Sequence, residues 1–123
     1  MGFSESFVAA FNARDLEALA ECLAPDAKAR VEGAPFPEEV GREAIRDTSL
    51  AYLLGEDARL HAEAVDHPEV SVVLFDGRGR LDVAIEFEES DGLAVSLTYY
   101  TVPNAPERLA AIASDLGRPL ADS

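Results

Sequence analysis

Three aromatic rings recur along one face of the first helix that the sequence predicts. Phe3, Phe7 and Phe11 are spaced four residues apart, and residues 16–23 repeat the helical spacing of apolar side chains. Between these two segments, Asp15 is placed to cap the second helix. Strand patterns dominate the remainder of the chain. Two short amphipathic helices followed by a β-rich remainder are typical of a small conical protein with a pocket.

The other elements follow from changes of periodicity and from turn residues. Strands are expected at residues 27–32, 58–64, 70–75, 81–88 and 93–102, and helices at residues 41–54 and 105–116. Glycine-containing reversals at residues 76–79 and 91–92 predict two hairpins. With 123 residues, of which 48% are apolar, the chain is expected to form a single domain over residues 1–123.

The charge balance excludes some classes of partner. The chain has 24 acidic and 10 basic residues and a formal net charge of -14. Such a charge repels nucleic-acid phosphates and anionic membrane surfaces, so neither partner is expected. The sequence shows no secretory signal and no apolar run of membrane-spanning length, which makes a cytoplasmic location the default expectation. The single cysteine, Cys22, is expected to be a packing residue.

Two segments carry a resemblance to a known superfamily. FVAAFNARDLEALAECLAPDA at residues 7–27 resembles the helix-helix opening of the nuclear transport factor 2-like superfamily, and GREAI at residues 41–45 resembles its third-helix entry. This group includes ketosteroid isomerase, scytalone dehydratase and SnoaL-like polyketide cyclases. The resemblance covers about residues 3–102 and implies a cone-shaped, strongly curved, mostly antiparallel sheet wrapped around a cavity. The expected α+β fold then has three helices in its N-terminal half and one C-terminal helix.

The implied cavity would be lined mainly by apolar side chains. Ala62 and Ala64, on the inward face of a predicted strand, are too small to fill the space behind them, which favours a hollow interior. The expected lining, which could equally be ordinary core, consists of Phe7, Phe11, Val31, Tyr52, Leu60, Val83, Ile85, Phe87, Leu97 and Tyr99. Tyr52 and Tyr99 are the candidates for orienting a ligand, because a buried phenol usually needs a hydrogen-bond partner.

The residues do not carry the catalytic set of ketosteroid isomerase. That enzyme holds an enolate with a tyrosine and a protonated aspartic acid, and uses a separate aspartate as the base. The resemblance places these roles at Phe7, at Val31 and at Val83 or Ala84, none of which has a titratable side chain. Steroid isomerisation is therefore not expected.

A histidine and a glutamate on one strand are the remaining weak candidates for acid-base catalysis. His61 alternates with Leu60 and Ala62, so strand parity places His61 and Glu63 on the outer face of the sheet. A bulge near Asp66 would instead turn both side chains inward as an acid-base pair.

Other catalytic centres find little support in the sequence. An epoxide-hydrolase site needs an arginine between two carboxylates, but Arg46 and Asp47 are adjacent on the third helix and are expected to diverge. The chain has no metal-binding motif and no glycine-rich strand-to-helix loop. We therefore expect neither a metal nor another cofactor.

The sequence favours a binding protein over an enzyme. The first hypothesis is a protein of nuclear transport factor 2-like fold that binds a small hydrophobic ligand. The second is a lyase or isomerase of polyketide-cyclase or dehydratase type that acts on a hydrophobic cyclic substrate through His61, Glu63 or an acid of residues 35–39. The third is a non-catalytic dimeric interaction module. A homodimer is expected through the outer sheet face, which carries Ala84, Glu86, Ser96, Thr98 and Tyr100.

Overall fold

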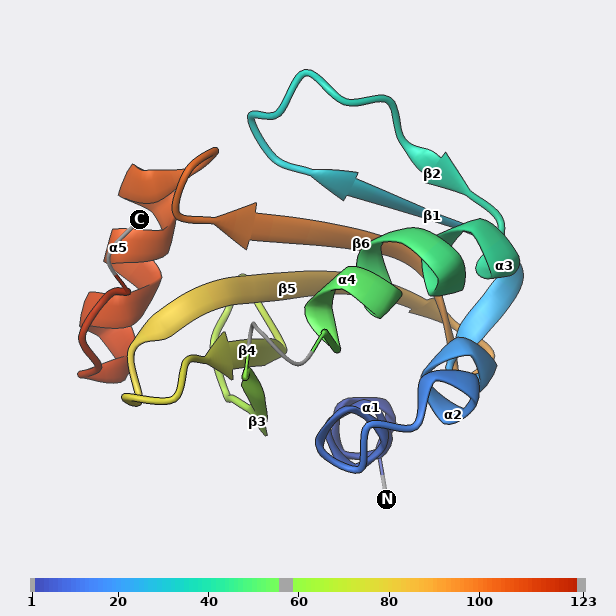
Figure 1. The fold of residues 1–123 in the computed structure, drawn as a ribbon, viewed down its shortest axis with the longest axis horizontal. Helices are drawn as coiled ribbons and strands as arrows, with labels where there is room; N and C mark the ends of the chain where they lie inside the picture. The colour runs from blue at the N-terminus through green and yellow to red at the C-terminus, as the bar shows by residue number, and fades with distance from the viewer. Residues whose placement is uncertain (1, 56–58, 122–123) are drawn as a thin grey trace.

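A computed structural model describes residues 2–55 and 59–121 of the chain (Figure 1). Its elements are, in chain order, α1 (Phe3–Asn12), α2 (Leu16–Glu21), β1 (Leu23–Val31), β2 (Glu39–Val40), α3 (Arg42–Ile45), the π-helical turn η1 (Arg46–Leu50), α4 (Ala51–Leu53), β3 (His61–Ala64), β4 (Val72–Phe75), β5 (Leu81–Ser90), β6 (Leu93–Thr101) and α5 (Pro106–Leu116). The expected α+β fold is confirmed. Ala58, the expected start of one strand, lies outside the described residues. No helix among those described has the length and apolarity needed to cross a membrane.

Six strands form one mixed sheet in the order β2-β1-β6-β5-β4-β3. The pair β1 and β6 runs parallel, whereas the other neighbouring pairs are antiparallel. The expectation of a mostly antiparallel sheet is therefore confirmed. The cone shape and the strong curvature stay predictions.

Helices α1 to α4 cover one face of the sheet, which we call the helix-side face (Figure 1). Its buried strand residues include Ala29, Ala62, Val72, Leu74, Val83, Ile85, Leu97 and Tyr99. The fully buried ring of Phe7 anchors α1 to this face, with its centroid 5.1 Å from the Phe87 ring and 6.5 Å from the Phe11 ring. The aromatic stripe expected from the sequence thus packs directly on the sheet.

Helix α5 covers part of the opposite face, which we call the α5-side face. Leu109, Ile112 and Ala113 of this helix are buried in one cluster with Ala84 and Tyr100. The amphipathic pattern of residues 105–116 explains this placement, because its apolar stripe needs a second apolar surface to cover. The expected homodimer through this face stays a prediction. Two of its proposed contact residues, Ala84 and Tyr100, lie under the chain's own helix.

The helical segment formed by α3, η1 and α4 contains a π-helical turn, η1, where a continuous α-helix was expected. The expectation was a helix over residues 41–54 with Tyr52 among the lining residues of a cavity. In the structure, Ile45 and Leu50 are both fully buried, and the five-residue step between them spans η1. A π turn advances the chain by more residues than an α turn, so the buried stripe shifts phase. Tyr52 consequently points outward and is 80% exposed.

Candidate functional site

The strand register brings a carboxylate and a phenol to the helix-side face. Ala29 in β1 is paired with Glu39 in β2 on one side and with Leu97 in β6 on the other. Directly paired residues share a face of the sheet, and Ala29 and Leu97 belong to the helix-side core. Glu39 therefore points toward the helices, as does Tyr99, two residues beyond Leu97.

A hydrogen-bonded chain joins these two side chains through Ser49 of η1. The Ser49 hydroxyl donates to Oε1 of Glu39 at 2.7 Å, and Ser49 Oγ lies 2.9 Å from the Tyr99 hydroxyl oxygen. Tyr99 is 2% exposed, whereas Ser49 and Glu39 are half-buried. The chain thus leads from the protein surface into the helix-side core. We call these three residues the polar chain.

The sequence pointed to Tyr99 and to the segment that contains Glu39, but it did not connect these two residues. Tyr99 was expected to orient a ligand, and residues 35–39, which include Glu39, were expected to be one source of an acid. Ser49 lies 50 residues from Tyr99, and no local sequence signal links them. Ser49 lies within the helix expected at residues 41–54 and was not among the expected lining residues.

The two tyrosines of β6 should make the stability of the fold sensitive to alkaline pH. Burial raises the pKa of Tyr99, and burial together with a hydrogen bond to Glu86 raises the pKa of Tyr100 to about 12. In the unfolded chain both phenols ionise at about pH 10. Above that pH the unfolded state therefore releases protons that the folded state retains. The free energy of unfolding should therefore fall as the pH rises from about 10 toward 12.

Urea unfolding measured at several alkaline pH values checks this expectation. The wild type should lose stability more steeply above about pH 10 than the double variant Tyr99→Phe/Tyr100→Phe, which lacks both titrating groups. Equal slopes for the two proteins would show that these phenols do not contribute to the pH dependence.

Most of the expected lining residues meet in one cluster, although no cavity is shown among them. Phe7, Phe11, Leu60, Val83, Ile85, Leu97 and Tyr99 are buried in the helix-side core, and Val31 and Phe87 are partly buried against it. The exception is Tyr52, whose exposure contradicts the expected pocket-lining role. Ala64 is paired with Val72 and so shares the helix-side face with Ala62, as expected, but it is exposed there and does not face an enclosed space.

The acid-base candidates on β3 do not face the helix-side core. His61 is paired with Phe75 and Glu63 with Val73, and both partners belong to the α5-side cluster. The pairing of β3 with β4 is regular, so the alternative in which a bulge turns both side chains inward is contradicted. His61 is exposed, and Glu63 forms an ion pair with Arg118 at 3.6 Å.

The positions that correspond to the ketosteroid isomerase set are divided between the two faces. Phe7 and Val83 lie in the helix-side core, and Val31 is partly buried against it. Ala84 belongs to the α5-side cluster. The apolar side chains at these positions supply no proton donor or base to the helix-side face.

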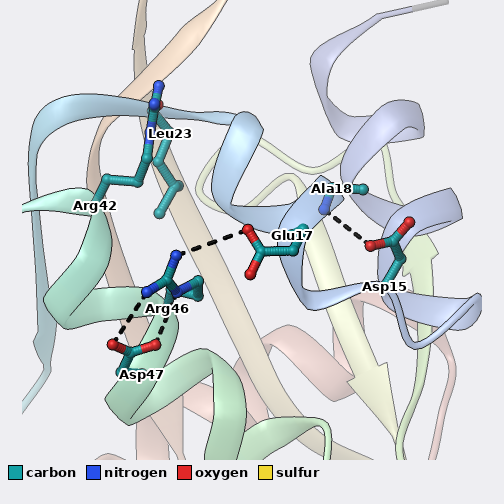
Figure 2. Close-up of polar contacts among 7 residues, drawn as sticks. All are labelled: Asp15, Glu17, Ala18, Leu23, Arg42, Arg46 and Asp47. Atoms are coloured by element: carbon teal, nitrogen blue, oxygen red, sulfur yellow. Dashed lines mark hydrogen bonds and ion pairs between the residues drawn. The ribbon is translucent and has the colours of Figure 1, made fainter.

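An open pocket lies at the edge of the sheet, where β2 leads into α3. It has a volume of about 420 Å³ and is lined by Pro25 and residues 40–44. Val40 is paired with Lys28 and lines this pocket, whereas the preceding residue, Glu39, points to the helix side. The guanidinium of Arg42 donates a hydrogen bond from Nε to the Leu23 carbonyl oxygen at 2.9 Å, which fixes the position of its side chain. Both residues are labelled in Figure 2.

Near this pocket, an arginine lies between two carboxylates, as Figure 2 shows. Arg46 contacts Asp47 at 2.7 Å and Glu17 of α2 at 3.7 Å. The expectation that Arg46 and Asp47 diverge was wrong, because the long arginine side chain folds back onto its neighbour. The side chains of Asp47 and Glu17 are 61% and 75% exposed, so the group is a surface ion-pair network. Such a network links α2 to η1.

Comparison with known proteins identifies the family. A family model described as a SnoaL-like domain matches residues 4–108. No curated protein matches the sequence significantly. Many solved structures do, including a candidate polyketide cyclase from Sinorhizobium meliloti, which has 23% sequence identity and a TM-score of 0.59. That alignment covers 79% of this chain and 92% of the other.

Two further solved structures illustrate the range of similar proteins. A candidate ketosteroid isomerase from Kribbella flavida is 23% identical with a TM-score of 0.59, over 80% of this chain and 74% of the other. A protein of ketosteroid isomerase-like fold from Catenulispora acidiphila was solved in complex with trimethylamine. It is 17% identical with a TM-score of 0.54, and the alignment covers 85% of this chain and 92% of the other. Because the family model spans most of its length, the chain belongs to the SnoaL-like family of nuclear transport factor 2-like proteins.

Proposed function

We propose that this protein binds a small, largely apolar organic molecule at the helix-side face of its sheet. The apolar part of the ligand would contact the core side chains around Val31 and Leu97. Its polar group would bind the polar chain of Glu39, Ser49 and Tyr99. The observation that carries the proposal is the polar chain, whose hydrogen bonds lead from the half-exposed carboxylate of Glu39 to the buried phenol of Tyr99 within an otherwise apolar core.

Burying the Tyr99 phenol costs more free energy than burying an apolar ring in the same place. A phenol removed from water must recover its lost hydrogen bonds inside the protein, and a phenylalanine at the same position would avoid that requirement. Tyr99 does recover one hydrogen bond, but only through a serine that the π turn presents. π-helical turns occur frequently at functional sites. The neighbour that holds trimethylamine supports the idea that a domain of this fold can hold a small organic ligand.

Fluorescence titration with 2-naphthol, a neutral aromatic probe with one hydroxyl group, tests the proposal. The chain contains no tryptophan, so protein emission does not obscure that of the probe. We expect saturable binding that weakens about fivefold in Tyr99→Phe, because a hydrogen bond to the ligand contributes about 1 kcal/mol. The matched control is Tyr100→Phe, which removes a phenol from the α5-side face of the same strand.

The control separates a local effect from a loss of fold. Tyr100 donates to Glu86 at 2.7 Å, so each tyrosine variant removes one phenol and one hydrogen bond. Binding should be unchanged in Tyr100→Phe. No saturable binding to the wild type, or equal losses in the two variants, would contradict the proposal.

A lyase or isomerase is the second candidate, because the polar chain ends in a carboxylate that could accept a proton from a bound substrate. Similarity to a candidate polyketide cyclase agrees with this alternative. Mass spectrometry of candidate cyclic substrates after incubation with the protein separates the two functions. A binding protein returns each compound unchanged.

A further inference from the structure

The direction of the hydrogen bonds in the polar chain restricts what it can recognise. Glu39 is half-exposed and accepts the hydrogen bond from Ser49, and a carboxylate has no proton to donate. The Ser49 hydroxyl has one proton, which it donates to Oε1 of Glu39. Ser49 can therefore take part in the contact with Tyr99 only as the acceptor, so Tyr99 donates its own single proton to Ser49.

Both protons of the chain are thus committed within the protein. Ser49 and Tyr99 contribute one donor each, and Glu39 contributes none. What the three side chains still offer are lone pairs, on the Tyr99 oxygen, on the Ser49 oxygen and on the two carboxylate oxygens. No other described residue forms a hydrogen bond or ion pair with Oε2 of Glu39.

We infer that the polar chain selects ligands that carry a hydrogen-bond donor, such as an alcohol, a phenol or an amine, and rejects ligands whose polar group only accepts, such as a ketone or an ether. This inference rests on the proposed function and specifies its ligand class. Each of the three side chains offers only acceptors to a ligand. Burial favours the neutral, protonated phenol by raising the pKa of Tyr99, which keeps the donor to Ser49 in place.

The charge of the protein also favours ligands that carry a hydrogen-bond donor. A formal net charge of -14 attracts cationic groups, and an ammonium group is a donor without acceptor capacity. A carbonyl ligand, by contrast, would bring its lone pairs against those of the polar chain. A site that leaves polar groups unpaired discriminates strongly against the ligand responsible.

Three naphthalene derivatives of similar size test the inference. The probes are 2-naphthol, which has a donor, and 2-methoxynaphthalene and 2-acetylnaphthalene, whose oxygens only accept. We expect the wild type to bind 2-naphthol about tenfold more tightly than either of the other probes, as measured by isothermal titration or probe fluorescence.

Ser49→Ala provides the decisive variant. It removes the acceptor that holds the Tyr99 proton, so the phenol becomes free to donate to a ligand. Binding of 2-acetylnaphthalene should then strengthen about tenfold, and the preference for 2-naphthol should shrink or disappear. Ser49→Thr retains the hydroxyl group and should retain the wild-type preference. Circular dichroism melting establishes that each variant is folded.

The outcomes separate this inference from the proposed function. If Tyr99→Phe weakens binding but the wild type shows no preference for 2-naphthol, the ligand class is wrong and the binding function stands. If the preference exists but Ser49→Ala leaves it unchanged, the direction of the hydrogen bonds is not its cause. If no probe binds, or if Tyr99→Phe has no effect, the proposed function itself fails.

Discussion

Replacing Phe7 by alanine should destabilise the fold by about 3–5 kcal/mol, because the substitution removes a large buried ring and leaves a cavity. Phe7 is fully buried, and its ring contacts those of Phe3, Phe11 and Phe87. A domain of this size has a total stability of about 5–15 kcal/mol, so the variant should be close to unfolding. Urea unfolding followed by circular dichroism measures the effect.

Phe36→Ala is the control for this prediction. Phe36 lies in the segment between β1 and β2 and is 64% exposed, so its loss should change the free energy of unfolding by no more than about 0.5 kcal/mol. Similar effects at both positions would mean that α1 does not pack on the sheet as described.

Gly33→Ala should cause the second large loss of stability. Gly33 is the second residue of the segment between β1 and β2 and has φ of 80°, a conformation that costs other residues about 1–2 kcal/mol. A Cβ atom at this position would also collide with the backbone carbonyl oxygen of Asn104, which adds about 1–3 kcal/mol. The contact fixes the start of the segment that leads to Glu39, so probe binding should weaken as well.

Gly92→Ala isolates the contribution of the collision. Gly92 has φ of 81°, nearly the same backbone conformation, but no atom lies within 4 Å of the place where a Cβ would be built. Alanine there should have only the conformational cost of about 1–2 kcal/mol and should leave probe binding unchanged. Equal destabilisation at the two glycines would contradict the described contact with Asn104.

Local patterns predicted the elements well where one periodicity holds throughout a segment. The four-residue spacing of Phe3, Phe7 and Phe11 does form the buried face of α1. Asp15 caps α2 by accepting from the backbone N–H of Ala18 at 3.1 Å, as Figure 2 shows. The two-residue alternation around His61 correctly placed that side chain away from the helix-side core. Each of these outcomes depends on neighbours within a few residues.

The errors occurred where the backbone departs from a regular period or where distant segments meet. The π turn η1 shifts the phase of the third helix, so the assignment of Tyr52 to the core was wrong. The local residue types did not indicate such a turn, although Ile45 and Leu50 on either side of it are both fully buried. The connection of Glu39, Ser49 and Tyr99 needs the parallel pairing of β1 with β6, which a single sequence does not reveal.

Under the proposed function, the polar chain would recognise a ligand in a different way from ketosteroid isomerase. That enzyme presents donors to a developing oxyanion, whereas the three residues here present acceptors. The difference follows from the carboxylate at the end of the chain, which takes the serine proton and, through it, the tyrosine proton. If the proposal holds, two members of one fold family differ in ligand class through the direction of a few hydrogen bonds.

The most direct test of this account is a crystal structure of the protein with 2-naphthol. The account predicts that the naphthol oxygen lies within hydrogen-bonding distance of Glu39, Ser49 or Tyr99, with its rings against the helix-side core. Density for the probe in the open pocket beside Pro25 and Arg42, or no density at the polar chain at a saturating concentration, would contradict it.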